Sequence, residues 1–286
     1  MEIFRSPREM QSWADARRAA GKRLGLVPTM GCLHEGHLSL LRVARERGCD
    51  EVAATIFVNP AQFGPGEDFE RYPRQEESDL GMLRDAGADA VLLPGVREIY
   101  PEGYQTFVEV GEVSKGLCGD RRPGHFRGVA TVVAKLLIIG KPHAAVFGEK
   151  DFQQLAVIRR MVLDLNLDVE VVGAPIVREP DGLAMSSRNR YLEGGDRTAA
   201  RCLSRGLFRA RELFRAGERG AEKLAAAARR EIEAEPRAAL EYAEARDPEA
   251  LAPLAGPAER MTILVAAKVG PPRLIDNITL EGGGAT

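Results

Sequence analysis

Short apolar runs alternate with longer amphipathic stretches along this chain. Each run is bounded by turn formers and predicts a buried strand: residues 23–27, 51–58, 90–93, 143–147 and 169–172. A capping box at Ser6–Glu9, with proline at the first helical position, predicts a helix over residues 7–20. Further helices are predicted between the strands, over residues 38–44, 76–85, 128–139 and 150–166. Strands that are apolar on both faces and alternate with helices indicate a parallel sheet. We therefore expect an α/β fold with a Rossmann-like parallel sheet and helices on both of its faces.

The pattern changes near residue 190. Residues 196–235 are rich in Ala, Arg, Glu and Leu, and Gly217 and Gly220 separate two predicted helices. The strands of a small sheet are predicted over residues 240–245, 261–268 and 273–275. We expect two domains: a Rossmann-like domain over residues 1–176 and a smaller α+β domain over residues 177–286.

Two histidines follow the first of the apolar runs. Pro28 and Gly31 are expected to end the strand, and His34 and His37 then stand three residues apart near the start of a helix. At that spacing they share one helical face, beside free backbone N–H groups and the positive end of the helix dipole. Phosphate suits such a corner best, so we favour nucleotide binding over a pair of surface histidines.

Two further polar segments carry phosphate-binding chemistry. In segment 147–151, Gly148 lets backbone approach a ligand closely, Lys150 can follow phosphate oxygens, and Asp151 can accept bonds from ribose hydroxyls. Cluster 185–190 brings two hydroxyls and a guanidinium group that can grip a triphosphate. Taken alone, segment 147–151 also fits a plain polar loop, and cluster 185–190 a helix cap followed by surface arginines.

The loop after the run 51–58 places Gln62, whose amide can bind a small polar substrate. The Gly- and Pro-containing stretch 64–73 predicts a lid that excludes water, with a simple surface loop as the alternative. Asp79 is a candidate Mg²⁺ ligand because hard oxygen ligands suit that ion, with a solvated helix carboxylate as the alternative. For His125 we favour a structural or substrate-shaping role over that of a base.

Composition narrows the class of protein. Hydrophobic residues make up 44% and charged residues 29% of the chain, as in soluble globular proteins. A net charge of -2 without a basic stripe gives no reason to expect a nucleic-acid partner. No signal-peptide pattern and no membrane-spanning apolar run is evident, so we expect no membrane association and a cytoplasmic location. The cysteines are expected to be reduced thiols, and Cys32 is not expected to be a nucleophile.

Taken together, these segments resemble the pantoate–β-alanine ligases, the pantothenate synthetase family. The matching segments are PTMGCLHEGH at 28–37, FVNPAQF at 57–63, YPR at 72–74, HFRGV at 125–129, FGEKDFQQL at 147–155, MSSRN at 185–189 and RLIDN at 273–277. The histidine motif and the MSSR segment also resemble the HIGH and KMSKS signatures of the nucleotidyltransferase superfamily. FVNPAQF and FGEKDFQQL narrow the match to this one family.

The resemblance implies an AMP-forming amide synthesis in two steps. The carboxylate of (R)-pantoate attacks the α-phosphate of Mg·ATP, giving pantoyl adenylate and pyrophosphate, and the amine of β-alanine then displaces AMP. It also implies small-molecule substrates, a homodimer formed through the N-terminal domain, and a C-terminal domain that closes over ATP. Two alternatives stay open: another nucleotidyltransferase of the same superfamily, and an RNA-binding fragment related to an aminoacyl-tRNA synthetase.

The resemblance also assigns site residues. Catalysis is assigned to His37, the proton donor, and to His34, Lys150 and Arg188. ATP binding is assigned to thirteen residues: Met30, Gly31, His34, His37, Gly148, Glu149, Lys150, Asp151, Val177, Met185, Ser186, Ser187 and Arg188. Pantoate is assigned to Gln62 and Gln154, and Mg²⁺ to Asp79. Two positions depart from the family pattern: Cys32 stands where a small residue such as Ala is usual, and Ser78 where some members carry a second Asp.

Overall fold

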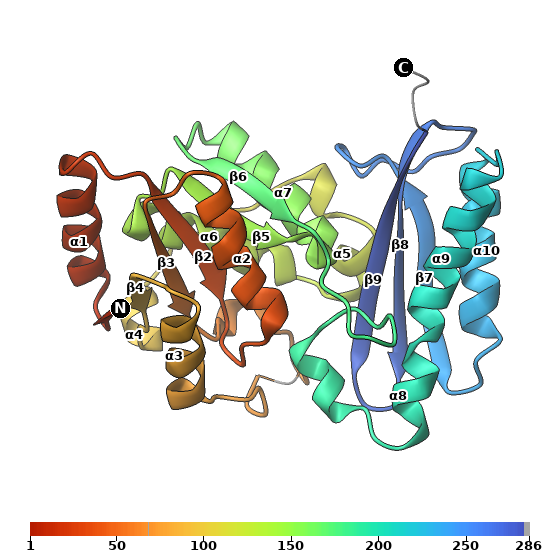
Figure 1. Ribbon diagram of the computed structural model, residues 1–286, viewed down its shortest axis with the longest axis horizontal. Helices are drawn as coiled ribbons and strands as arrows, with labels where there is room; N and C mark the ends of the chain where they lie inside the picture. The colour runs from red at the N-terminus through yellow and green to blue at the C-terminus, as the bar shows by residue number, and fades with distance from the viewer. Residues whose placement is uncertain (68, 283–286) are drawn as a thin grey trace. The chain divides into compact units, whose positions relative to one another are not determined.

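The computed structural model of the protein describes residues 1–67 and 69–282 (Figure 1). The chain divides into two compact units. The first consists of Met1–Glu149 and Gln153–Pro175, and the second of Lys150–Phe152 together with Ile176 and the residues that follow it. The short segment Lys150–Phe152 thus folds with the C-terminal part of the chain, although the first unit surrounds it in sequence.

The first unit is built on a parallel sheet with the strand order β1-β4-β3-β2-β5-β6. Its strands are β1 (Glu2–Phe4), β2 (Leu24–Thr29), β3 (Glu51–Ile56), β4 (Ala90–Leu92), β5 (Ala144–Gly148) and β6 (Glu170–Ala174). The chain runs outward from β2 through β3 to β4 and then returns to the other side of β2 to form β5 and β6. In open α/β sheets, ligands bind beyond the carboxyl ends of the strands at such a reversal, which here lies between β2 and β5.

Helices cover both faces of this sheet. Successive strand residues point to opposite faces, and Val27 of β2 belongs to an apolar cluster with Leu40 of α2 (Glu35–Glu46). Its neighbour Leu26 faces α6 (His125–Gly140), because a Cβ placed on Gly140 would lie 3.2 Å from the Leu26 side chain. The other helices are α1 (Pro7–Ala19), α3 (Glu76–Asp85), α4 (Val96–Ile99), α5 (Leu117–Arg121) and α7 (Phe152–Asp164).

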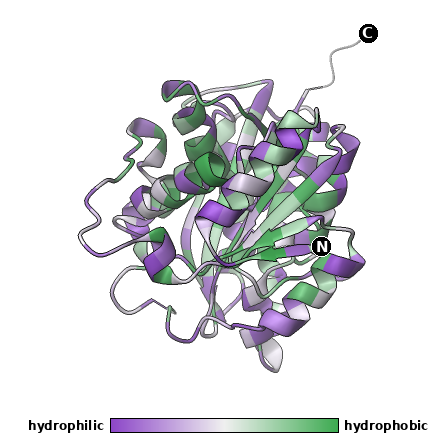
Figure 2. Ribbon diagram, turned by 90° about the vertical axis from the view of Figure 1, so that its left-hand side faces the viewer, coloured by the Kyte–Doolittle hydropathy of each residue, from purple (hydrophilic) through white to green (hydrophobic). Residues whose placement is uncertain are grey.

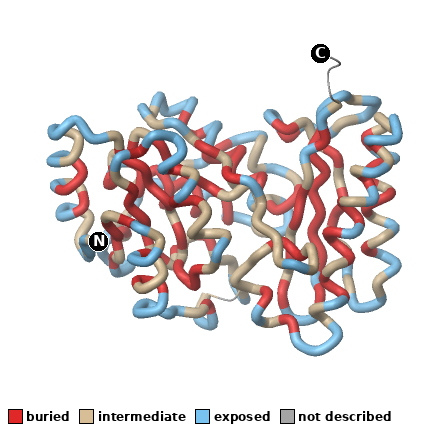
Figure 3. Tube along the Cα trace, in the orientation of Figure 1, coloured by how far each residue is buried: buried red, intermediate tan, exposed pale blue. Residues whose placement is uncertain are grey.

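The strands carry the apolar core of the first unit. Leu24, Val52, Val91 and Val146 are at most 1% exposed. Figure 3 draws these strands mostly in the red of buried residues, and Figure 2 shows hydrophobic residues along the strands and hydrophilic ones on outer helix turns and loops. The predicted Rossmann-like parallel sheet with helices on both faces is confirmed.

The second unit is a layer of helices on an antiparallel sheet. Its strands are ordered β7 (Ala238–Arg246), β8 (Arg260–Val269) and β9 (Arg273–Glu281), and its helices are α8 (Gly195–Ala200), α9 (Cys202–Arg215) and α10 (Ala221–Glu233). Leu203 and Leu207 of α9 and Leu224 of α10 are fully buried in one apolar cluster with Ile263 and Val265 of β8. The predicted smaller α+β fold is confirmed.

Pro28 lies inside β2, so the prediction that it ends the strand is wrong. The carbonyl of Thr29 accepts a bond from Phe57, on the β3 side of the strand. The nitrogen of Pro28, one residue earlier, therefore faces the β5 side, where β5 pairs only with Gly25 and Leu26. No ladder bond is lost at the proline, which is why the strand tolerates it.

Other differences are small. The sequence did not predict β1, a three-residue strand that pairs with β4 at the edge of the sheet. Helix α6 begins at His125 rather than at Gly128. The predicted lid, residues 64–73, includes Asp68, which lies outside the described residues.

Within residues 1–67 and 69–282, no helix is both long enough and apolar enough to cross a membrane. Cys32, Cys49, Cys118 and Cys202 are all buried, and no disulfide joins them.

Candidate active site

The histidine motif lies at the carboxyl end of β2. After a turn over residues 30–33, His34 is the N-cap of α2. The His34 N–H donates to Nδ1 of His37 at 3.3 Å, and the two ring centroids lie 4.1 Å apart. Because Nδ1 of His37 accepts this bond, the neutral ring carries its proton on Nε2. His37 is therefore fixed in the tautomer that suits a proton donor acting through Nε2.

The backbone N–H groups of the loop just before α2 are engaged within the protein. The N–H groups of Cys32 and Leu33 both donate to the carboxylate of Asp79 at 2.8 Å. The N–H of Gly31 donates to the Thr29 hydroxyl at 3.2 Å. The amides of residues 31–33 are therefore already occupied within the protein, which leaves the start of α2 and its dipole as the part of this loop that favours an anion.

Asn59 organises the turn at the carboxyl end of β3, just before the short helix η1 (Pro60–Gln62). Its Oδ1 accepts bonds from the Ala61 N–H at 3.2 Å and the Tyr100 hydroxyl at 2.8 Å. Burial raises the pKa of Tyr100, so its phenol remains a neutral donor. The Asn59 Nδ2 donates to Oε1 of Gln62 at 2.9 Å and to the Gly128 carbonyl at 3.1 Å. Two accepted and two donated bonds fix the amide in one orientation.

This orientation of Asn59 sets the chemistry that Gln62 offers. Since Oε1 of Gln62 accepts from Asn59, its Nε2 points the other way and contacts the sulfur of Met30 at 3.1 Å. Gln62 is 8% exposed, so little room remains for another rotamer. The side chain thus presents N–H donors at the carboxyl end of the sheet, as a carboxylate or hydroxyl ligand requires.

Close packing of α6 against η1 fixes the same turn. A Cβ on Gly128 would lie 2.1 Å from the carbonyl oxygen of Ala61 and 2.6 Å from the nitrogen of Gln62. Replacing Gly128 by alanine should therefore push η1 away and lower the free energy of unfolding by about 1–3 kcal/mol, measured by urea denaturation. In the control Gly81→Ala in α3, the new Cβ meets nothing within 4 Å. Equal losses in the two variants would contradict this account.

His125 and Arg122 hold the carbonyl side of Gln62. Nδ1 of His125 lies 2.9 Å from the Gln62 carbonyl, and its Nε2 lies 3.0 Å from Arg122. Arg122 also donates to both carboxylate oxygens of Glu67, at 2.8 and 2.6 Å. Burial alone would raise the pKa of Glu67, but its bonds with Arg122 outweigh that effect and hold the pKa below its ordinary value. Glu67 is therefore ionised at neutral pH, and its ion pair with Arg122 links the start of the predicted lid to the segment between α5 and α6.

Strand β5 ends at Gly148, and Glu149 and then the first turn of α7 follow it in the chain. Of two successive glutamines there, Gln153 is 4% exposed and its amide is used internally. Its Oε1 accepts from the Cys118 N–H at 3.0 Å, and its Nε2 donates to the carbonyls of Val113 and Lys115 at 3.2 and 3.1 Å. Gln154 is only partly buried, which leaves it as the glutamine able to meet a ligand.

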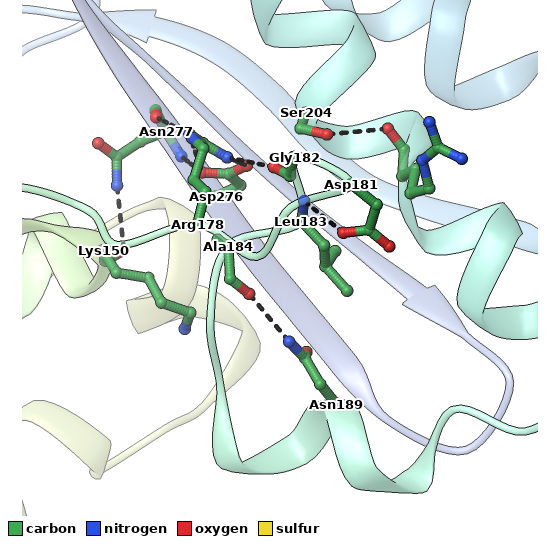
Figure 4. Close-up of polar contacts among 11 residues, drawn as sticks. Lys150, Arg178, Asp181, Gly182, Leu183, Ala184, Asn189, Ser204, Asp276 and Asn277 are labelled. Atoms are coloured by element: carbon green, nitrogen blue, oxygen red, sulfur yellow. Dashed lines mark hydrogen bonds and ion pairs between the residues drawn. The ribbon is translucent and has the colours of Figure 1, made fainter. Parts of the chain in front are cut away.

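In the second unit, strand β9 anchors Lys150 (Figure 4). The Asn277 side chain donates from Nδ2 to the Lys150 carbonyl at 3.0 Å. Beside it, the Asp276 carboxylate is buried and accepts two bonds from Arg178, at 2.7 and 2.9 Å. Arg178 donates a further bond to the Gly182 carbonyl at 3.1 Å. This ion pair, with its carboxylate buried, fixes β9 to the segment around residue 180, and Asn277 fixes the backbone at Lys150.

The MSSR segment begins the short helix η4 (Ser187–Tyr191) of the second unit. Ser186 is its N-cap, and the Ser186 hydroxyl accepts a bond from the Arg188 N–H at 3.3 Å. The Met185 N–H donates to the Val177 carbonyl at 3.0 Å, so Val177 lies directly beside this segment. The helix cap of the alternative interpretation is therefore present, while the role of this cluster toward a triphosphate stays a prediction.

The Asn189 side chain holds the MSSR segment in place through two hydrogen bonds. Its Nδ2 donates to the Glu179 carboxylate at 2.7 Å and to the Ala184 carbonyl at 3.0 Å. Glu179 in turn accepts from Arg197 at 2.6 Å. The segment is thus held by a network within its own unit, which limits its freedom before any ligand binds.

The sequence-predicted residues fall into two groups. In the first unit, the carboxyl ends of β2, β3 and β5 bring together Met30, Gly31, His34, His37, Gln62, Gly148 and Glu149, with Gln154 on α7. The second unit holds Lys150, Asp151, Val177, Met185, Ser186, Ser187 and Arg188. Within the first group, Met30 and Gln62 are in direct contact.

Asp79 does not fit the predicted Mg²⁺ contact. It is 1% exposed, and each carboxylate oxygen already accepts a backbone N–H. Mg²⁺ requires near-octahedral access and retains several waters, which this buried position does not offer. Among the described residues, no cluster of three or more His, Cys, Asp or Glu side chains is arranged to hold a metal ion.

The fold is that of a Rossmann-like α/β protein, with polar residues gathered at the carboxyl ends of β2, β3 and β5, where ligands bind in such sheets. The sequence model of the family "Pantoate-beta-alanine ligase" matches residues 2–279. The chain belongs to the pantoate–β-alanine ligase family.

Individual relatives agree with this family. The chain is 53% identical to the pantothenate synthetase of Geobacter sulfurreducens, over 98% of this chain and 99% of that one. It is 55% identical to the enzyme of Myxococcus xanthus, over 98% of this chain and 96% of that one. The crystal structure of pantothenate synthetase from Thermus thermophilus superposes with a TM-score of 0.90 at 46% identity, over 97% of this chain and 99% of that one.

A further solved relative has ligands bound. The pantoate-beta-alanine ligase from Francisella tularensis, complexed with beta-gamma ATP and beta-alanine, superposes with a TM-score of 0.80 at 32% identity. The match covers 97% of each chain.

Sequence reasoning assigned no role to several residues that shape this site. They are Asn59, Glu67, Tyr100, Arg122, Arg178, Asn189, Asp276 and Asn277. Four of them lie within the family motifs FVNPAQF, MSSRN and RLIDN: Asn59, Asn189, Asp276 and Asn277. Their place in these motifs could have marked them as residues of the site. The other four, Glu67, Tyr100, Arg122 and Arg178, lie outside those motifs, so motif matching could not have identified them.

Proposed function

We propose that this protein catalyses the ATP-dependent condensation of (R)-pantoate with β-alanine, giving pantothenate, AMP and pyrophosphate through a pantoyl adenylate. The observation that carries the proposal is the family match over residues 2–279. The ligand-bound Francisella relative supports ATP and β-alanine as ligands of this chain too. The proposal makes the protein a ligase of small molecules.

In the first step, the pantoate carboxylate attacks the α-phosphate of ATP, and negative charge develops on the phosphate oxygens and on the leaving pyrophosphate. His37 donates a hydrogen bond or proton to these oxygens from Nε2, since its Nδ1 is held by the His34 backbone. His34, Lys150 and Arg188 supply further donors or positive charge. Groups already positioned in this way stabilise the developing charge without reorganising during the reaction.

Pantoate is held by the two amides, Gln62 and Gln154. Gln62 presents N–H donors because Asn59 fixes its Oε1, which suits the carboxylate and hydroxyl oxygens of pantoate. The remaining nucleotide contacts are proposed for Met30, Gly31, Gly148, Glu149, Asp151, Val177, Met185, Ser186 and Ser187. In the second step, the amine of β-alanine attacks the acyl adenylate. The loop that contains Glu67, held by the bond from Arg122 to that carboxylate, helps to shield the acyl adenylate from water.

Mg²⁺ remains part of the proposal only as the companion ion of the ATP phosphates. Asp79 does not fit as its ligand, and we assign the ion no other protein contact. The homodimer, the cytoplasmic location and the closing of the C-terminal domain, residues 177–286, over ATP are proposed from the family resemblance.

Pantoate-dependent exchange between pyrophosphate and ATP tests the function. With Mg²⁺, pantoate and labelled pyrophosphate but no β-alanine, label should appear in ATP, because adenylate formation is reversible. Omitting pantoate should abolish the exchange, and adding β-alanine should then yield AMP and pantothenate. A folded protein that binds ATP but gives no pantoate-dependent exchange would exclude the adenylate mechanism.

A further inference from the structure

We infer that Asp79 is a positioning residue, which holds the loop that carries the two histidines, and that it is not a metal ligand. The inference rests on the proposed function, because it concerns how that site is built. Asp79 lies in the first turn of α3 and contacts the loop between β2 and α2. Its two oxygens accept the N–H groups of Cys32 and Leu33, each at 2.8 Å, and the side chain is buried.

The backbone of this loop is shaped around the carboxylate. Gly31 and Cys32 both have left-handed backbone conformations, with φ of +80° and +52°. Successive N–H groups in such a turn converge on one point and form a concavity for an anion. Here Asp79 supplies that anion. A Cβ on residue 31 would lie 2.8 Å from Oδ2 of Asp79, so the glycine is what allows the carboxylate to approach.

The carboxylate also compensates for strain. A non-glycine residue with positive φ, as at Cys32, persists where its surroundings over-determine it. The bond from the Cys32 N–H to Asp79 fixes that residue, and the bond from Leu33 fixes the residue directly before His34. Because His34 is the N-cap of α2 and its N–H orients His37, a shift of Leu33 would displace both rings.

The variant Asp79→Asn separates a positioning role from a metal-binding role. The amide is nearly the same size, but it replaces one acceptor by a donor that faces a backbone N–H. We expect the maximal rate of pantoate-dependent exchange to fall about tenfold or more, while the Mg²⁺ concentration for half-maximal rate changes less than about twofold. A metal ligand would give the opposite pattern: a large rise in the Mg²⁺ requirement, with the rate restored by excess Mg²⁺.

The matched control is Glu77→Gln, which removes an exposed carboxylate from the same helix. It should leave the exchange rate and the Mg²⁺ requirement unchanged. Nitrogen-15 NMR of the histidine side chains supplies a readout that does not depend on turnover. In Asp79→Asn, His37 should lose its single tautomer and show a mixture of Nδ1- and Nε2-protonated rings, whereas an unchanged His37 spectrum would overturn the inference.

A measurement on the wild-type protein covers the case in which Asp79→Asn does not fold. Mn²⁺ added without nucleotide should leave the amide signals of Cys32 and Leu33 sharp, because the carboxylate is already engaged. Selective broadening of these two signals would place a metal at Asp79 and overturn the inference. If the wild-type protein shows no pantoate-dependent exchange, the proposed function fails, while the NMR results still decide the role of Asp79.

Discussion

Replacing His37 by alanine should lower the rate of pantoate-dependent ATP–pyrophosphate exchange by about 10²–10⁴-fold, the range expected when a positioned proton donor is lost. The reason is geometric: the His34 N–H occupies Nδ1 of His37, so the ring keeps a proton on Nε2. The ring is only partly buried and its loss removes one bond at a helix start, so the free energy of unfolding should fall by about 1 kcal/mol or less. Exchange kinetics and urea denaturation measure the two effects.

His143 provides the control for this variant. Its Nδ1 also accepts a backbone N–H, from Leu24 at 2.9 Å, but at the amino end of β2 rather than the carboxyl end. His143→Ala should therefore cost a comparable amount of stability and leave exchange near the wild-type rate. Wild-type exchange in His37→Ala would remove His37 from the mechanism, and equal loss of exchange in both variants would show that only the fold was being perturbed.

Replacing Arg178 by methionine should destabilise the second unit by about 3–5 kcal/mol, the cost of leaving a buried charge without its partner. The Asp276 side chain is 2% exposed, and both of its oxygens accept from the Arg178 guanidinium. Methionine fills similar space but supplies no donor. Thermal and urea unfolding measure the loss, and exchange should fall as well, because β9 carries Asn277, which holds the Lys150 carbonyl.

An exposed ion pair serves as the comparison. Arg160 and Asp164 pair on the surface of α7, with side chains 52% and 47% exposed. Arg160→Met should change the unfolding free energy by about 0.5 kcal/mol or less. In the double variant Arg178→Met, Asp276→Leu, much of the lost stability should return, because no charge is then left buried. If Arg178→Met alone unfolds no more easily than Arg160→Met, the buried pair does not stabilise this unit.

The helices and strands could largely be predicted from the sequence because local chemistry decides them. Ser6 and Glu9 form the capping box that starts α1 at Pro7, and α3 has the predicted bounds Glu76–Asp85. Pro28 could not be judged in this way. Whether a proline ends a strand depends on whether a neighbouring strand pairs at that position, and the pairing of β2 with β5 ends at Leu26.

The candidate site was predicted as segments but not as contacts. Polar segments that directly follow apolar strands must gather at one edge of a parallel sheet, so their neighbourhood follows from the pattern. The partners of individual groups do not. Asp79 lies 47 residues after Cys32, and only the packing of α3 brings its carboxylate into contact with the loop. The same holds for Arg178 and Asp276, which stand 98 residues apart.

The segment Lys150–Phe152 belongs to the second unit, and this limits how the chain can be divided into fragments. A gene fragment that ends at Pro175 would keep this segment but lose Asn277, which holds the carbonyl of Lys150. A fragment that begins at Ile176 would keep Asn277 but lose the lysine. A cut at that junction therefore separates the two partners of this hydrogen bond and leaves the second unit without one of its segments. The second unit is thus assembled from two separate stretches of the sequence, and an engineered version of it has to contain both.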